Sequence, residues 1–186
     1  PSGSSGDPAV VVLPSFVLEF VFGLSLARLS KSQLIMTEKI QKAGTNLIIT
    51  GGNGHFAGVG FNKLMQHLTP RLAKKLTFIP AEQPIEKTVK QLNGIGQIAS
   101  ITTDPSMLEI LTREKEVGRL QIEPKLFKVS GETFTSELRK RVEKVFPSLE
   151  FCILNHYACT ECLFMAFECD CGRQHVLEDW VILEAV

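Results

Sequence analysis

The sequence predicts an α/β fold with a largely parallel sheet, and three observations carry this prediction. Short β-branched or apolar runs alternate with segments of helical spacing through most of the 186 residues. Hydrophobic residues make up 44% of the chain and charged residues 22%, so it can bury a real core. The formal net charge is +0, which argues against disorder and gives no support to nucleic-acid binding.

The N-terminal part reads as a loop, a strand and a long helical stretch. Residues 1–8 are rich in Gly and Ser, and Ala9–Leu13 is a β-branched run ended by a proline. Residues 15 to about 43 place apolar side chains at helical spacing. The apolar run from Ala9 to Ala27 is interrupted by Pro14, Ser, Glu and Gly, so we expect a strand and a helix and no membrane span.

The middle of the chain continues the alternation. Asn46–Thr50 is a short buried strand, and a Gly-rich loop follows over residues 51–60. Residues 61–75 have leucines at helical spacing and a basic end, which suits a helix C-terminus. Leu76–Ile79 is a strand closed by a proline, and Ile85–Leu92 is a short helix.

The C-terminal half adds two helices and further strands. A strand over Ile98–Thr102 precedes a helix over Pro105–Glu116, for which Thr103 or Asp104 is a suitable N-cap. Phe134–Phe146 is a second helix, with apolar residues along one face. The remaining predicted strands are Leu126–Val129, Glu150–Leu154 and, as a hairpin or strand pair, Val176–Val186.

The loop before the first predicted strand has the composition of an anion-binding loop. Small residues let the backbone wrap closely around a phosphate, while hydroxyls and amides donate hydrogen bonds. The loop lacks the Lys-Ser/Thr pair of a P-loop and precedes a strand instead of following one. A solvated terminus or a cloning remnant are the alternative interpretations. The residues concerned are Ser2, Gly3, Ser4, Ser5 and Gly6.

Two later stretches carry candidate binding residues. Val129–Thr133 ends a strand and opens a helix, which exposes backbone amides around Gly131 and Glu132. The alternative is a plain strand-to-helix turn, with Glu132 in the first helical turn where the macrodipole favours an acid. The other stretch, Asn155–Glu161, combines an aromatic ring, a hydroxyl and a carboxylate within seven residues.

Together these three stretches resemble the adenylate-forming enzymes, in particular the phenylacetate–CoA ligase branch. The last stretch is similar to the family's Tyr-Gly-x-Thr-Glu motif, with Ala158 in place of the glycine, and residues 166–179 resemble the segment that follows it. The first loop lacks the basic residue of many members, because Ala9 stands in its place. The resemblance implies that residues 2–6 hold the β- and γ-phosphates of ATP. It also implies the following roles: Gly131, Glu132 and Tyr157 at the adenine, Thr160 at the α-phosphate, Glu161 on Mg²⁺, and His55 and Phe56 in the acyl pocket.

The resemblance further implies ATP-dependent activation of a small carboxylic acid, followed by transfer of the acyl group to CoA or to another nucleophile such as an amine. The resemblance to this branch implies an aromatic acid as the substrate. Residues 1–186 would be the central part of the large domain, without its front and without the C-terminal domain, and therefore inactive alone. No signal peptide is visible, so we expect a cytoplasmic location. The oligomeric state stays open, with a homodimer as one option.

Four of the five cysteines lie within residues 159–171, and they support a rival hypothesis. Thiolates and imidazole are zinc ligands, and Cys169, Cys171 and His175 are the best candidates for a structural zinc module without catalysis. Buried free cysteines are the plainer interpretation. A second rival takes the loop over residues 51–60 as the phosphate loop of a different α/β nucleotide binder. Its glycines do not follow the Gly-x-Gly-x-x-Gly pattern, and no acid stands about 20 residues further on at a strand end.

Overall fold

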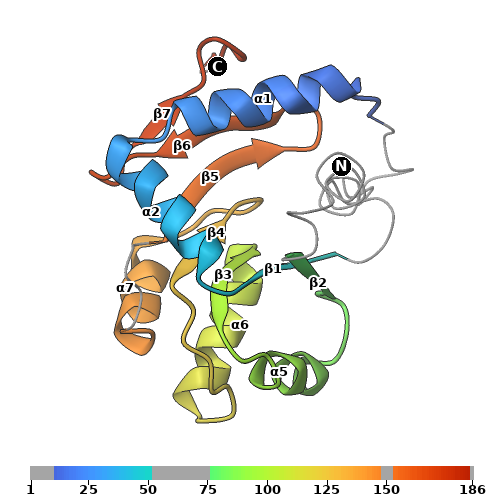
Figure 1. Ribbon diagram of the computed structural model, residues 1–186, viewed down its shortest axis with the longest axis vertical. Coiled ribbons are helices and arrows are strands. Elements are labelled where there is room, and N and C mark those ends of the chain that lie inside the picture. The colour runs from blue at the N-terminus through green and yellow to red at the C-terminus, as the bar shows by residue number, and fades with distance from the viewer. Residues whose placement is uncertain (1–10, 52–75, 148–152, 185–186) are drawn as a thin grey trace.

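A computed structural model gives the structure of the chain and describes residues 11–51, 76–147 and 153–184. Within these ranges, seven strands form one sheet in the spatial order β2-β1-β3-β4-β5-β6-β7 (Figure 1). In chain order the strands are β1 (Thr45–Thr50), β2 (Leu76–Pro80), β3 (Ile98–Thr103), β4 (Leu126–Val129), β5 (Leu154–Cys159), β6 (Leu163–Glu168) and β7 (Gln174–Val176).

The sheet is parallel from β2 to β5 and antiparallel beyond it. β1 pairs in parallel with both β2 and β3, and the ladder continues in parallel through β4 to β5. β6 then runs antiparallel to β5, and β7 antiparallel to β6. The predicted α/β class with a largely parallel sheet is therefore confirmed.

Helices cover both faces of the sheet. Their bounds are α1 (Ser15–Ala27), α2 (Lys31–Lys42), α5 (Ile85–Asn93), α6 (Pro105–Glu116) and α7 (Ser136–Val145). The main core lies between the sheet and α5, α6 and α7, where Phe127 of β4 meets Phe146 edge to face at 5.1 Å between ring centroids. On the opposite face Ile40 of α2 packs on Ala99, Leu126 and Leu154, and α1 lies across β6 (Figure 1).

Several element bounds differ from those that the sequence predicts. The expected helix from residue 15 to about 43 is two helices, because Ser30 begins a new one. Its hydroxyl accepts from the Gln33 amide at 3.1 Å, and the Gln33 side chain accepts from the Ser30 amide at 3.0 Å. The predicted strand over Ala9–Leu13 is wrong for its described part, since residues 11–13 are in no regular structure. The predicted helix over 61–75 lies outside the described residues.

The C-terminal strands also begin and end elsewhere. β5 extends to Cys159, whereas the expectation ends that strand at Leu154. β6 is absent from the sequence-based expectation. The predicted hairpin over Val176–Val186 is wrong, because β7 ends at Val176 and residues 177–184 form turns and irregular backbone.

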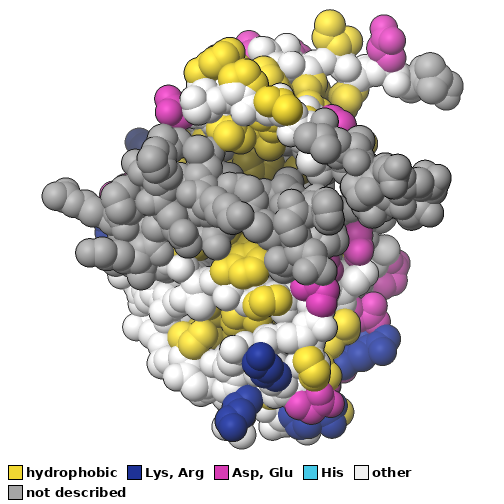
Figure 2. All heavy atoms as spheres, turned by 90° about the vertical axis from the view of Figure 1, so that its right-hand side faces the viewer, with side chains coloured by type: hydrophobic (Ala, Val, Ile, Leu, Met, Phe, Trp, Pro, Cys, Tyr) yellow, Lys and Arg dark blue, Asp and Glu magenta, His cyan; other side chains and the backbone are white. Residues whose placement is uncertain are grey.

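Helix α1 presents apolar side chains to solvent. Phe16 and Phe20 are 67% and 50% exposed, and hydrophobic side chains gather at the top of the molecule, where α1 lies (Figure 2). Exposed apolar patches mark surfaces where proteins make contacts. Among the helices of the described residues, none has the length and apolar character that crossing a membrane requires.

Candidate functional site

The strand order places a topological switch point between β1 and β3. From β1 the chain moves to β2 on one side and then returns to β3 on the other side. Because these strands are parallel, the backbone after Thr50, Thr103, Val129 and Cys159 emerges at one end of the sheet, which we call the carboxyl edge. Ligands of open α/β sheets bind at this edge, near the switch point. It is therefore the first place to look for a site.

The turn from β3 into α6 supplies polar groups to the carboxyl edge. Asp104 is the N-cap of α6, and its Oδ1 accepts a hydrogen bond from the Met107 amide at 2.7 Å. Burial raises the pKa of Asp104, and the negative charge of Glu132 adds to that rise, while the Met107 amide opposes it. The hydroxyl of Thr103 is buried without a hydrogen-bond partner among the described residues. A hydrogen-bond donor or acceptor added at this edge would give the Thr103 hydroxyl a partner.

The turn after β4 lies directly beside the start of α6. Gly131 has φ of +93°, a conformation that glycine adopts without strain. The carboxylate of Glu132 accepts hydrogen bonds from the Ser106 amide at 3.1 Å and from the Ser106 hydroxyl. Glu132 thus stabilises the N-terminus of α6. The expectation that Val129–Thr133 opens a helix is wrong, because α7 begins at Ser136 with Thr135 as its N-cap. The alternative that places Glu132 in the first turn of that helix is wrong for the same reason.

The strand register brings the predicted adenine and phosphate residues to one edge. Val129 is the last residue of β4 and pairs with Asn155, so β5 continues past the end of β4 from His156 to Cys159. Tyr157 stands two residues beyond Asn155, as Gly131 stands two residues beyond Val129. Tyr157 is 54% exposed, which leaves its ring free to stack on a planar ligand. The two motifs, whose Gly131 and Tyr157 are 26 residues apart in sequence, therefore both lie toward the carboxyl edge.

Thr160 and Glu161 occupy the turn between β5 and β6. Glu161 is exposed, and hydrogen bonds from its own backbone N–H and then from the Cys159 thiol lower the pKa of its carboxyl. Glu161 is therefore ionised at neutral pH. Magnesium is usually held by one or two carboxylates together with substrate phosphates. A single ionised carboxylate beside a hydroxyl fits that arrangement.

Trp180 fixes this turn from outside the motif. Its indole Nε1 donates to the Cys162 carbonyl at 2.6 Å, and its ring lies 6.0 Å from that of Phe20 of α1. Leu163 follows the turn with φ of +62°, a conformation that costs a non-glycine residue about 1–3 kcal/mol. Such strain persists only where neighbouring contacts hold it. No motif in the sequence indicates that Trp180 contacts this turn.

The opposite face of β5 carries a histidine without a predicted role. The ring of His156 lies 4.5 Å from that of Phe167 and 5.6 Å from that of Phe164. Burial lowers the pKa of His156 to about 3, and the positive charge of Lys128 on β4 contributes. His156 is therefore neutral at physiological pH, and it packs the strand without adding charge to the edge.

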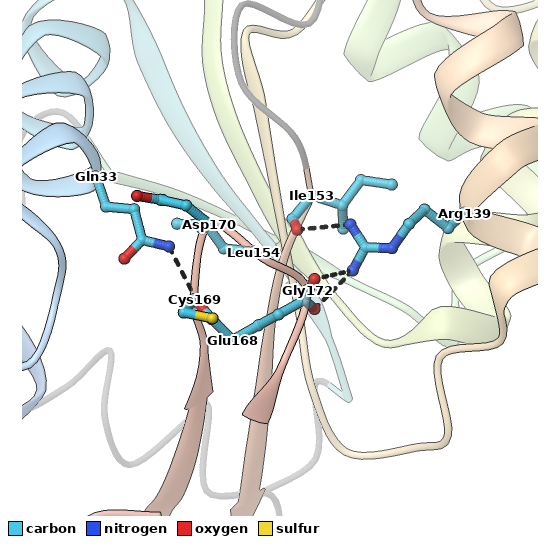
Figure 3. Close-up of a pocket in the computed structure, with 8 residues that line it drawn as sticks. All are labelled: Gln33, Arg139, Ile153, Leu154, Glu168, Cys169, Asp170 and Gly172. Carbon is cyan, nitrogen blue, oxygen red and sulfur yellow. Dashed lines mark hydrogen bonds and ion pairs between the residues drawn. The ribbon is translucent and has the colours of Figure 1, made fainter. Parts of the chain in front are cut away.

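A cavity of about 250 Å³ lies at the other end of β5, away from the carboxyl edge (Figure 3). Arg139 of α7 donates to both carboxylate oxygens of Glu168 at 2.6 Å, and to the Ile153 carbonyl at 3.2 Å. The Gln33 amide donates to the Glu168 carbonyl at 3.0 Å. Arg139 and Glu168 thus pair with each other at this cavity, and Asp170 accepts a hydrogen bond from the Ser32 hydroxyl of α2 at 2.8 Å. We therefore interpret the cavity as structural, at the junction of α2, α7 and the end of β6.

The predicted zinc residues do not form a metal site. Backbone amides of Arg173 and Cys171 lower the pKa of the Cys169 thiol, with a further contribution from a His175 hydrogen bond. Cys169 and His175 are thus in contact. Among the described residues, however, no group of three or more His, Cys, Asp or Glu side chains could hold a metal ion. The zinc hypothesis for Cys169, Cys171 and His175 therefore has no support, because a structural site needs four ligands around one point.

Two other predicted groups fall on parts of the chain that the structure does not describe. They are the phosphate loop over residues 2–6, and the pocket residues His55 and Phe56 with nearly all of the loop over residues 51–60. Of that loop, Gly51 is described, and it follows β1 at the switch point. Both groups stay predictions.

The fold is similar to that of a malonyl-CoA ligase solved as a product complex with methylmalonyl-CoA and AMP. The TM-score is 0.54 at 14% sequence identity, and the match covers 89% of this chain and 33% of that one. A luciferase-like enzyme from the nonluminescent mealworm Zophobas morio matches with a TM-score of 0.48 at 14% identity, over 73% of this chain and 32% of that one. The chain thus spans about a third of the length of either structure. No protein-family model matches the sequence, and no curated protein is significantly similar.

Proposed function

We propose that this chain carries the nucleotide-binding edge of an adenylate-forming enzyme, which joins ATP and a carboxylic acid into an acyl-adenylate and releases pyrophosphate. The observation that carries the proposal is the register of β4 and β5. It brings Gly131 and Glu132 to the same edge as Tyr157, Thr160 and Glu161. The fold of the malonyl-CoA ligase, whose structure holds AMP, supports the same assignment.

The acidic side chains at the carboxyl edge indicate where the base and the phosphates of the nucleotide would bind. Glu132 and Asp104 place negative charge near the ends of β3 and β4, which repels phosphate but accepts hydrogen bonds from an amino group such as that of adenine. The base therefore lies beside Gly131 and Glu132, with the Tyr157 ring stacked on it. The phosphates lie toward Thr160, and residues 2–6 bind those furthest from the base.

The chain's residues stabilise charge in the transition state and move no proton. A carboxylic acid is already ionised at neutral pH, so its attack on the α-phosphorus needs no general base. The Thr160 hydroxyl donates to an α-phosphate oxygen as charge develops there. A magnesium ion held by Glu161 would supply positive charge at the same oxygens. The acyl group then passes to CoA or to another nucleophile, and aromatic acids are the first substrates to try.

The direct test is carboxylate-dependent exchange of labelled pyrophosphate into ATP. It is measured on the protein encoded by the whole reading frame that contains this chain, which we call the reading-frame protein. A panel of aryl and alkyl acids supplies the substrates, and a reaction without acid is the blank. We expect exchange above the blank with at least one acid. A folded protein that supports no exchange with any acid, and that does not bind ATP with magnesium, would refute the proposal.

A further inference from the structure

We propose that Cys159 and Cys162 are an oxidation site, where a reversible disulfide closes across the turn between β5 and β6. The two Sγ atoms lie 3.3 Å apart, and both cysteines are free and half-buried. Their Cys-x-x-Cys spacing is one that redox-active proteins use. No part of the proposed adenylation chemistry needs these thiols.

The turn brings the two sulfurs close enough for a disulfide to form with a small movement. Cys159 is the last residue of β5 and pairs with Leu163, so Thr160, Glu161 and Cys162 form a tight hairpin turn. A four-residue turn holds its end Cα atoms within about 7 Å, and disulfides span Cα separations up to about 6.8 Å. Bond formation shortens the Sγ separation from 3.3 Å to about 2.05 Å. The sulfurs therefore need to move by little more than an ångström.

The surroundings hold the two thiols together. The Trp180 indole anchors the Cys162 carbonyl, and the left-handed Leu163 fixes the exit of the turn. At the far end of the same hairpin, Cys169 contacts His175 instead of another thiol. The structure thus distinguishes one cysteine pair from the other cysteines that it describes.

Closing the disulfide changes the residues that it encloses, and this part of the inference rests on the proposed function. Thr160 and Glu161 lie inside the ring that the disulfide forms. Oxidation also replaces the hydrogen bond between the two thiols with a covalent bond. A displacement of about 1 Å at a catalytic position costs up to about 100-fold in rate. The oxidised turn is therefore a less active form of the site.

A peroxide is the oxidant that balances the reaction. One thiolate attacks a peroxide oxygen, the O–O bond breaks, and the sulfur becomes a sulfenic acid while the first water leaves. The second thiol then attacks that sulfur, the S–S bond forms, and the hydroxyl departs as the second water. Two electrons pass from the sulfurs to the peroxide, and a dithiol reductant reverses the change.

The first experiment detects the disulfide without any assay of activity. The reading-frame protein is treated with hydrogen peroxide, free thiols are alkylated, and the unfolded protein is cut after glutamate. Cleavage at Glu161 separates Cys159 from Cys162, so the flanking peptides stay joined only through a disulfide. We expect a reducible link between residues 151–161 and 162–168 that persists in Cys171→Ser and disappears in Cys159→Ser. Full alkylation of both cysteines, or the same link in Cys159→Ser, would overturn the proposal.

The second experiment measures the consequence for pyrophosphate exchange. We expect peroxide to lower exchange by about tenfold or more and dithiothreitol to restore it. Cys162→Ser cannot close the ring, so we expect peroxide to lower its exchange by a smaller factor than it does in the parent protein. Exchange that is unchanged in fully disulfide-linked protein would refute control of the site. Reduced protein without exchange would count against the proposed function, while the peptide link would still establish the oxidation site.

Discussion

Replacing Glu161 with glutamine is expected to lower acid-dependent pyrophosphate exchange by about 100-fold or more. Glutamine keeps the size and the exposed position of the side chain in the turn, but it removes the negative charge that would hold the magnesium ion. Loss of one charged or hydrogen-bonding group in a preorganised site typically costs about 10²–10³ in rate. The measurement is the initial exchange rate at saturating ATP and acid.

Glu178→Gln is the matched control for this variant. Glu178 is also exposed, lies beyond β7 and takes no part in the proposed site, so the same chemical change there should leave exchange at the parent rate. Thermal melting of both variants checks that neither substitution unfolds the protein. A Glu161→Gln protein that melts normally and exchanges at the parent rate would remove Glu161 from the site.

Arg139→Ala is expected to destabilise the fold by about 3 kcal/mol at pH 7, because it leaves the Glu168 carboxylate buried without a partner. Both oxygens of Glu168 accept from Arg139 at 2.6 Å, and the Glu168 side chain is 9% exposed. The variant also loses the contact between the guanidinium and the Phe134 ring at 5.0 Å. Urea denaturation followed by circular dichroism gives the free energy of unfolding.

The destabilisation by Arg139→Ala should depend on pH with a defined sign. Burial raises the pKa of Glu168 above 4.5, and Arg139 opposes that rise, so its removal raises the folded-state pKa further. The protonated form is then favoured by folding, and stability falls as pH rises from the unfolded pKa through the folded one. The loss of stability should therefore be smaller at about pH 4 than at pH 7.

Arg141→Ala tests whether this effect belongs to the buried pair. Arg141 stands on the same helix and pairs with Glu116 at 2.6 Å, but both side chains are about one-third exposed, at 35% and 36%. Exposed pairs of this kind contribute about 0–1 kcal/mol. Equal losses of stability in the two arginine variants would contradict the claim that the buried pair of Arg139 and Glu168 stabilises the fold more than an exposed pair does.

Local patterns predicted the parallel half of the fold well. Short apolar runs bounded by Pro, Gly or Asp mark β1, β2, β3 and β4, and Asp104 before a proline marks the start of α6. The sequence analysis does not predict β6, because its short apolar run, Leu163–Glu168, stands between cysteines whose spacing also fits metal ligands. The spacing of apolar residues does not predict the break at Ser30, because helical spacing continues across it.

The candidate site could be predicted in its residues but not in its arrangement. The motif resemblance selects the site residues, but only the register of β4 and β5 shows that they share an edge. These residues are Gly131, Glu132, Tyr157, Thr160 and Glu161. The hydrogen bonds from Ser106 to Glu132 join residues 26 positions apart, and the hydrogen bond from Trp180 to Cys162 joins residues 18 positions apart. No local pattern encodes such contacts, because they depend on how the elements pack.

The most direct test of the nucleotide-binding edge is hydrogen exchange of the backbone amides with and without AMP, measured on the reading-frame protein. We expect AMP to slow exchange in residues 129–133 and 156–161, which the pairing of β4 with β5 places toward the same edge of the sheet. The turn over residues 169–173, beside the cavity at the other end of β5, should exchange at an unchanged rate. Binding of AMP that protects neither 129–133 nor 156–161, or that protects 169–173 instead, would contradict the proposed site.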